Sequence, residues 1–149
     1  MVKLVENDYE WIPAGEGEIP SGAFVGGEDH NGDLFIGRVD HNNDLLPGKI
    51  NQEYKLCYIG WGGLEHEKSK YQVLCGKGFE WVSSSGNNVP AGAVPGGFSK
   101  GEVLYIGRAP HMGTLPIGRV QPSHGVCYIS YGGNEFSYPD YEILVHKSS

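Results

Sequence analysis

The sequence has few charged residues, few cysteines and no long apolar run, and each scarcity excludes a class of protein. Only 19% of its 149 residues are charged, while 24 are glycine and 9 are proline, which favours a folded chain with many turns over a disordered one. The three cysteines lack Cys-x-x-Cys spacing and cannot all pair, so we expect reduced, buried thiols. Because no signal peptide or membrane span is recognisable, we expect a cytoplasmic location, with release by a non-classical route as the alternative.

Signatures of catalysis and metal binding are equally scarce. The chain lacks the second histidine of a zinc-protease motif, the phosphate-binding Gly-x-x-x-x-Gly-Lys and the Gly-x-Ser-x-Gly turn of hydrolases. Its six histidines are scattered, and we interpret them as surface or core residues. The net charge of −7 disfavours nucleic acid as a partner. The sequence therefore predicts a protein that is not an enzyme and that holds neither a metal nor a cofactor.

Two Asx-rich loops, "DHNGD" from Asp29 and "DHNND" from Asp40, resemble the start of a calcium loop. Both have a leucine at the sixth position, Leu34 or Leu45, where an EF-hand loop has glycine. Asp and Asn side chains commonly close turns by bonding to their own backbone. We therefore predict turns at both places, with a calcium site as the less favoured alternative.

The chain does contain an internal repeat, with an offset of 70 residues and no gap. "LFIGR" at 34–38 recurs as "LYIGR" at 104–108, and "CYIGWGG" from Cys57 recurs as "CYISYGG" from Cys127. The matching positions are mainly glycine, proline, aromatic and branched apolar residues, which a repeated backbone needs for its turns and its core. Two copies of one structural unit are predicted.

Each unit has the pattern of short β-strands. "DLFIGRV", "YKLCYIGW" and "YQVLC" are rich in aromatic and branched residues and are bounded by Gly, Pro, Asn or Asp. No segment keeps a helical apolar period for three turns without a glycine or proline. We therefore predict an all-β fold of two tandem, pseudo-symmetric repeats built from short antiparallel strands.

The register of the repeat predicts where its units begin and end. Leu4 aligns with Leu74 and with Leu144 at the tail of a repeat, so the chain begins with a repeat's last strand. We expect an N-terminal strand within residues 1–10, a first repeat over 11–75 and a second over 76–149, in one compact unit. This arrangement predicts strands exchanged between the repeats, which would close sheet edges that are otherwise unpaired.

With these motifs in place, the chain resembles the DM-nine repeat family. The resemblance rests on Trp11 and Pro20, on "LFIGR", "LLPGK" and "YIGWGG", and on the "EH" and "YQVL" that follow, so it covers nearly the whole chain. That family occurs alone in invertebrate proteins and fused to pore-forming modules in natterin-like toxins, and it includes two-repeat lectins with mannose specificity. The resemblance implies a β fold with exchanged repeats, a homodimer, and mannose-type glycans as partners.

The resemblance also implies two ligand-binding residues, Asp29 after the glycine turn and Lys49 in the Pro-Gly-Lys motif. A carboxylate accepts hydrogen bonds from two neighbouring hydroxyls and an ammonium donates to their oxygens, so the pair suits a sugar. Without the resemblance, Asp29 is interpreted as a turn residue and Lys49 as a solvated surface lysine.

The second repeat departs from this pattern, since Ser99 replaces the aspartate and Arg119 replaces the lysine. A serine lacks the charge and second oxygen of a carboxylate, so we expect weak or no sugar binding there and one good site per chain. Glu65 and Glu135 are further ligand-binding candidates. They either orient the two cations or form structural salt bridges.

The remaining repeated side chains are assigned mainly to the fold. Trp61 and Tyr131 could stack on a sugar, but aromatic residues in an alternating strand favour a core position. Arg38 and Arg108 occupy the same strand in both repeats and are expected to support it.

The predicted function is a lectin that recognises mannose-containing glycans in innate immunity, with avidity supplied by dimer formation. The alternative is an intracellular or vesicle-associated protein-interaction module without sugar binding. The two functions are distinguished by whether free mannose binds and whether Asp29→Ala abolishes that binding without changing the melting temperature.

Overall fold

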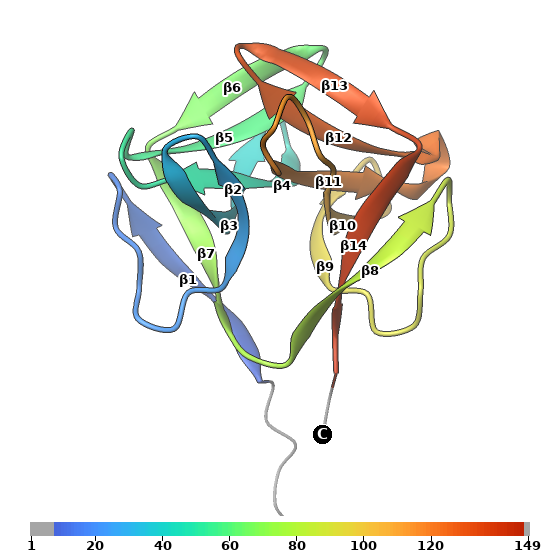
Figure 1. Ribbon diagram of the computed structural model, residues 1–149, viewed down its shortest axis with the longest axis horizontal. Coiled ribbons are helices and arrows are strands. Elements are labelled where there is room, and N and C mark those ends of the chain that lie inside the picture. The colour runs from blue at the N-terminus through green and yellow to red at the C-terminus, as the bar shows by residue number, and fades with distance from the viewer. Residues whose placement is uncertain (1–7, 148–149) are drawn as a thin grey trace, which may run out of the picture.

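A computed structural model describes residues 8–147, which form one sheet of 14 strands (Figure 1). The first repeat contains β1 (Tyr9–Gly15), β2 (Val25–Asp29), β3 (Gly32–His41), β4 (Asp44–Asn51), β5 (Leu56–Trp61), β6 (Leu64–Lys68) and β7 (Lys70–Gly76). The second contains β8 (Phe79–Ser85), β9 (Pro95–Ser99), β10 (Glu102–Arg108), β11 (Ile117–Gln121), the short 3-10 helix η1 (Pro122–His124), β12 (Val126–Tyr131), β13 (Asn134–Tyr138) and β14 (Asp140–His146). The all-β prediction is confirmed. Among the described residues, no helix has the length and apolar character needed to cross a bilayer.

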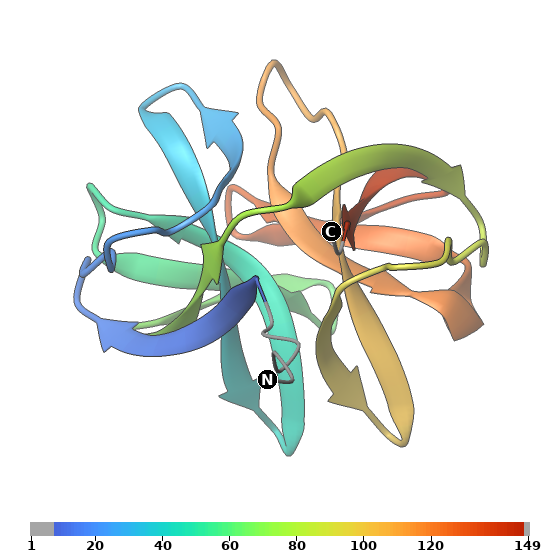
Figure 2. The same cartoon turned by 90° about the horizontal axis from the view of Figure 1, so that it is seen from below.

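The two repeats have the same strand order and lie side by side, as the two lobes of Figure 2 show. β1 pairs antiparallel with β7 along its full length, from Tyr9 opposite Gly76 to Gly15 opposite Lys70. β8 pairs with β14 in the same way. The expected boundary between residues 10 and 11 therefore lies inside β1. The expected strand around Leu4 lies outside the described residues.

Exchange between the repeats takes the form of reciprocal hydrogen bonding. The Leu115 N–H donates to the Glu28 carbonyl (2.7 Å), and the Glu28 N–H donates back to the Leu115 carbonyl (3.3 Å). The equivalent pairing in the other direction joins Leu45 of β4 to Phe98 of β9. β1 and β8 each stay within their own repeat, because β7 and β14 offer them a full-length partner.

Two glycine hairpins make a further junction between the repeats, where β6 meets β13 (Figure 1). Residues 62–63 and 132–133 are all glycines with positive φ, between 60° and 90°, as a tight two-residue hairpin of type I′ requires. The Glu65 N–H donates to Gly133 (2.9 Å), and the Glu135 N–H donates to Gly63 (3.0 Å). The paired hairpins thereby join the two repeats into one sheet.

The two Asx-rich loops close turns, as predicted. The Asp29 Oδ1 accepts a hydrogen bond from the Asn31 N–H (2.8 Å), which is an Asx turn. Asn42 and Asn43 adopt φ values of 51° and 67° in the hairpin between β3 and β4.

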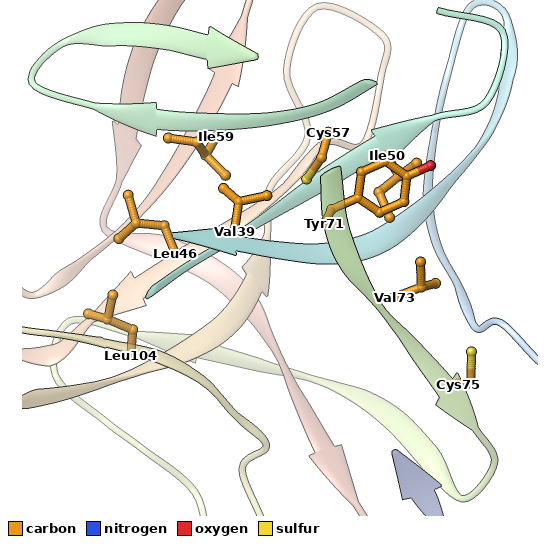
Figure 3. Packing of buried hydrophobic residues seen from close by; sticks show 9 residues of the cluster. All are labelled: Val39, Leu46, Ile50, Cys57, Ile59, Tyr71, Val73, Cys75 and Leu104. Atoms are coloured by element: carbon orange, nitrogen blue, oxygen red, sulfur yellow. The ribbon is translucent and has the colours of Figure 1, made fainter. Parts of the chain in front are cut away.

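Two of the three buried apolar clusters contain residues of both repeats. One buried cluster draws its residues from both halves of the chain: Leu34, Ile36, Leu74, Val94, Ile106, Ile117 and Leu144. A second cluster surrounds Cys57 in the first repeat and takes in Leu104 from the second (Figure 3). Because each repeat buries apolar surface against the other, the two form one folding unit. All three cysteines are free and buried, as predicted.

Arg38 and Arg108 support the fold, as predicted. The guanidinium carbon of Arg38 lies 4.2 Å from the ring centroid of Trp11, and its Nε donates to Gln72 Oε1 at 2.6 Å. Arg108 repeats the stacking on Trp81 at 4.2 Å. These cation–π contacts hold the first strand of each repeat against its centre.

The reciprocal pairing between repeats requires a glycine at Gly27, where an added Cβ would lie 2.1 Å from the Leu115 carbonyl oxygen. We expect Gly27→Ala to lower the free energy of unfolding by about 3 kcal/mol, because a paired backbone carbonyl cannot move aside. Gly62→Ala is the control, since its Cβ meets open space at a φ of 65°. The control should lose only about 1 kcal/mol. Equal losses in urea unfolding would contradict the importance of this contact.

Candidate functional site

Two cavities lie at the junction of the repeats. The first has a volume of about 340 Å³ and the second about 480 Å³. Each brings together three of the predicted site residues: Asp29, Lys49 and Glu65 in the first cavity, and Ser99, Arg119 and Glu135 in the second. The two cavities are therefore related by the internal repeat.

Each cavity is completed by an aromatic ring from the opposite repeat. Tyr131 of the second repeat lines the first cavity, and Trp61 of the first repeat lines the second. Both rings also pack against a buried cluster of their own repeat, so they have the predicted core contact and a cavity wall as well. The aligned histidines support these rings, with centroid distances of 5.4 Å from His41 to Trp61 and 5.0 Å from His111 to Tyr131.

Asp29 is both a turn residue and a cavity residue. Its Oδ1 accepts from the Asn31 N–H (2.8 Å), and its Oδ2 accepts from Nδ2 of Asn51 (2.9 Å). Tyr54 fixes both partners, because its OH accepts from Asn31 Nδ2 and its N–H donates to Asn51 Oδ1, each at 3.1 Å. A carboxylate oxygen can accept a second hydrogen bond, so this oriented group keeps capacity for a ligand.

Lys49 is buried, with only 8% of its surface exposed, so its interpretation as a solvated surface lysine is wrong. Its Nζ donates to the carbonyl of Ser130 in the opposite repeat and lies 3.3 Å from Glu65 Oε2. Burial lowers the pKa of Lys49, and the attraction of Glu65 opposes that shift. These partners use two of the three ammonium donors, which leaves one for a ligand.

Glu65 and Glu135 each hold a cation and the opposite hairpin at once. The Oε2 atom of Glu65 faces the Lys49 ammonium, and its Oε1 accepts a hydrogen bond from the Gly133 N–H (3.0 Å). Glu135 likewise lies 2.9 Å from Arg119 Nη1 and accepts from the Gly63 N–H (3.0 Å). Each glutamate therefore orients its cation through the salt bridge itself, so the two alternatives for these residues describe one contact.

The second cavity has the same frame with different polar groups. Arg119 donates through Nη1 to the Gly60 carbonyl and through Nε to Gln121 Oε1 (3.2 Å). Its guanidinium carbon lies 4.4 Å from the ring centroid of Tyr128. Ser99 stands in the place of the first cavity's aspartate and is 7% exposed. The second cavity therefore lacks the carboxylate acceptor of the first.

Several lining residues were not predicted from the sequence. Asn51 follows Lys49 by two positions on β4, so strand alternation could have placed it on the same face. Tyr58 lines the first cavity because it is the cross-strand partner of Lys49 on β5, a register that only the fold shows. Within residues 8–147, no group of three His, Cys, Asp or Glu side chains is arranged to hold a metal ion.

Replacing Glu65 by Gln leaves the buried Lys49 ammonium without its nearest counter-charge. We expect Glu65→Gln to lower the free energy of unfolding by about 2 kcal/mol at pH 7. The pKa of Lys49 is lowered by burial and raised by Glu65, so the variant loses this proton at a lower pH. As the pH rises from about 7 to 10, the native state sheds the unfavourable charge while the unfolded state keeps it, and the deficit shrinks. Urea unfolding across this range measures the change.

Glu135→Gln is the matched control, because the guanidinium of its partner Arg119 retains its charge over the same range. The loss in free energy of unfolding caused by Glu135→Gln should not vary with pH. A Glu65→Gln deficit that is equally constant would show that the charge of Lys49 is not the cause.

The solved structures provide a close match to this fold. The nematode sperm cell motility protein MFP2B is similar to this chain with a TM-score of 0.66 and 15% identity, over 99% of this chain and 48% of that one. This chain therefore spans about half the length of that protein. A search of curated proteins finds no match.

The family model of the DM9 repeat matches residues 1–63 and 28–138, so the two ranges together span most of the sequence. They include both hairpins and both groups of cavity residues. The resemblance expected from the sequence motifs is therefore confirmed, and the chain belongs to the DM9 (DM-nine) repeat family.

Proposed function

We propose that the chain is a carbohydrate-binding protein whose first cavity holds a mannose-type sugar. The observation that carries the proposal is the meeting of Asp29, Lys49 and Tyr131 in one cavity of about 340 Å³. A sugar presents hydroxyls that both donate and accept, beside faces of C–H groups. A concave site with a few fixed polar groups and an aromatic wall suits such a ligand.

In the proposed site, Asp29 and Lys49 make different hydrogen bonds with the sugar. Asp29 accepts hydrogen bonds from two neighbouring hydroxyls, and Lys49 donates to a hydroxyl oxygen. Both are held in place before the ligand arrives, Asp29 by Asn31 and Asn51, and Lys49 by Glu65. Preorganisation of this kind lowers the entropy lost on binding.

The proposal is for recognition without catalysis, in which a homodimer would present two first cavities to a mannose-rich microbial surface. Paired sites gain apparent affinity through effective concentration when both reach the same surface. The proposed location is the cytoplasm, and the three free, buried thiols suit a reducing compartment. Agglutination of mannan-coated beads and sedimentation of the purified protein would test the bridging and the dimer.

A protein-interaction module without sugar binding is the second candidate. The favouring observation is the similar fold of a nematode cell motility protein, although 15% identity supports the fold alone. A folded wild-type protein that binds no glycan on a broad array would favour this candidate.

Asp29→Ser, which copies the residue of the second repeat, tests the first cavity directly. We expect mannose affinity to fall about tenfold or more, because a charge-assisted acceptor is lost. Isothermal titration with mannose measures the affinity, and the melting temperature reports on the fold. Asp33→Ser is the control, since Asp33 is exposed on the same hairpin and does not line this cavity. Equal affinity in the two variants would contradict the proposed site.

Tyr131→Leu tests the wall supplied by the second repeat. We expect about fivefold weaker mannose binding, because the apolar contact with the sugar's C–H face is reduced. Trp61→Leu, the equivalent change in the other cavity, should leave mannose affinity unchanged. If both changes weakened mannose binding equally, the assignment of the sugar to the first cavity would be wrong.

A further inference from the structure

We infer that the second cavity is a separate site for an anionic sugar, one that carries a carboxylate, sulfate or phosphate group. This site lies beyond the mannose site proposed above and uses a different set of side chains. It shares with that site only the frame built by the two hairpins and the two buried ion pairs.

The balance of charge differs between the two cavities. In the first, Asp29 and Glu65 face one cation, Lys49, which leaves one net negative charge. In the second, Lys100 and Arg119 face one acid, Glu135, which leaves one net positive charge. A cavity with one excess positive charge attracts an anion, although the whole chain carries a net charge of −7.

Besides the buried cation, the second cavity is lined by two basic side chains, a lysine and a histidine, where the first cavity has one, His30. Lys100 lies in the exposed turn between β9 and β10, where the first repeat has His30. His124 replaces Tyr54, and its Nδ1 lies 2.7 Å from the Tyr128 OH, which leaves the other ring nitrogen for a ligand. Both side chains are exposed and line the cavity, and neither takes part in the Arg119 ion pair.

Glu102 is the acid next to these groups, and it is already occupied. Its carboxylate accepts from the Ser123 N–H (2.6 Å), the Ser123 hydroxyl (2.7 Å) and Gln121 Nε2 (3.2 Å). Burial opposes the ionisation of Glu102, but the hydrogen bonds from Ser123 and Gln121 outweigh it and lower the pKa, so the carboxylate stays charged outside the lining of the cavity. Gln121, held between Glu102 and Arg119, is left as a fixed polar group beside the cavity.

The remaining lining favours a sugar over a free anion. Trp61 offers an aromatic face, and Ser99, Gln121 and Ser137 offer neutral groups that can donate to or accept from hydroxyls. A bare anion would use the cations and leave the tryptophan without a contact. The combination of an aromatic wall, neutral polar groups and a positive rim matches a sugar with one acidic substituent.

Trp61 provides a signal specific to this cavity. The chain has three tryptophans, and Trp61 is the one that lines the second cavity. Trp11 and Trp81 are stacked beneath arginines at the other end of each repeat. The Trp61 indole N–H resonance, assigned by its loss in Trp61→Phe, can therefore be followed while the full chain is titrated with glucuronate, mannose 6-phosphate, mannose and inorganic phosphate.

The expected result is a saturable shift of this resonance with glucuronate or mannose 6-phosphate that weakens as salt rises. Lys100→Gln should weaken the binding about fivefold, as for loss of an exposed charge pair. Lys55→Gln is the matched control, because Lys55 is also exposed at a positive φ, 62° against 49°, and does not line the cavity.

Four outcomes would overturn the inference: no shift with either anionic sugar, an equal response to mannose, an equal affinity for inorganic phosphate, or equal binding by the Lys100 and Lys55 variants. Asp29→Ser should leave the Trp61 response unchanged. Failure of mannose to bind the first cavity would thus leave this result intact, and the two proposals can fail separately.

Discussion

The pair of buried cations at the junction of the repeats is the constraint on which the rest of the structure depends. Lys49 and Arg119 each bond a backbone carbonyl of the opposite repeat, at Ser130 and Gly60, and each faces a glutamate of its own repeat. Those glutamates in turn accept from the opposite glycine hairpins. A buried charge that loses its partners is strongly destabilising, so the repeats can dock in one register only. That register creates the two cavities, because it brings an aromatic ring of one repeat over the polar strand of the other.

The residues that join the repeats differ from those that face the cavities, so the same backbone can present different polar groups in its two cavities. Positions that build the junction keep their type between repeats, as the glutamates, the cations and the glycine hairpins do. Several positions that face the cavities have changed: Asp29 to Ser99, His30 to Lys100, Asn51 to Gln121 and Tyr54 to His124, with Tyr131 and Trp61 as the two aromatic walls. The charge type is kept at the junction, whereas the net charge of the lining residues changes from one negative in the first cavity to one positive in the second, which is why we propose a different ligand for the second cavity.

The sequence predicted the repeated fold well because its signals are local. Strands and turns follow from branched residues and from glycines such as those at 62–63, and the offset of 70 relates the two copies directly. The resemblance placed Asp29 and Lys49 together, and both line one cavity. The burial of Lys49 and the role of Tyr131 could not be predicted, because both depend on docking between residues that lie far apart in the chain. The same reason applies to the two functions of Glu65, because one of its partners, Gly133, belongs to the other repeat.

A site built at a junction links ligand binding to the stability of the whole chain. Lys49 is buried at the expense of its hydration, and Glu65 and the Ser130 carbonyl compensate for only part of that loss, since burial still lowers the pKa of the ammonium. A ligand oxygen that accepted the remaining N–H, as in the proposed mannose site, would offset more of that loss. A ligand in the proposed site would lie between Asp29 of one repeat and Tyr131 of the other, so it would be held only while the repeats are docked. Such a ligand would stabilise the docked state by mass action, which would link sugar binding to the stability of the whole chain.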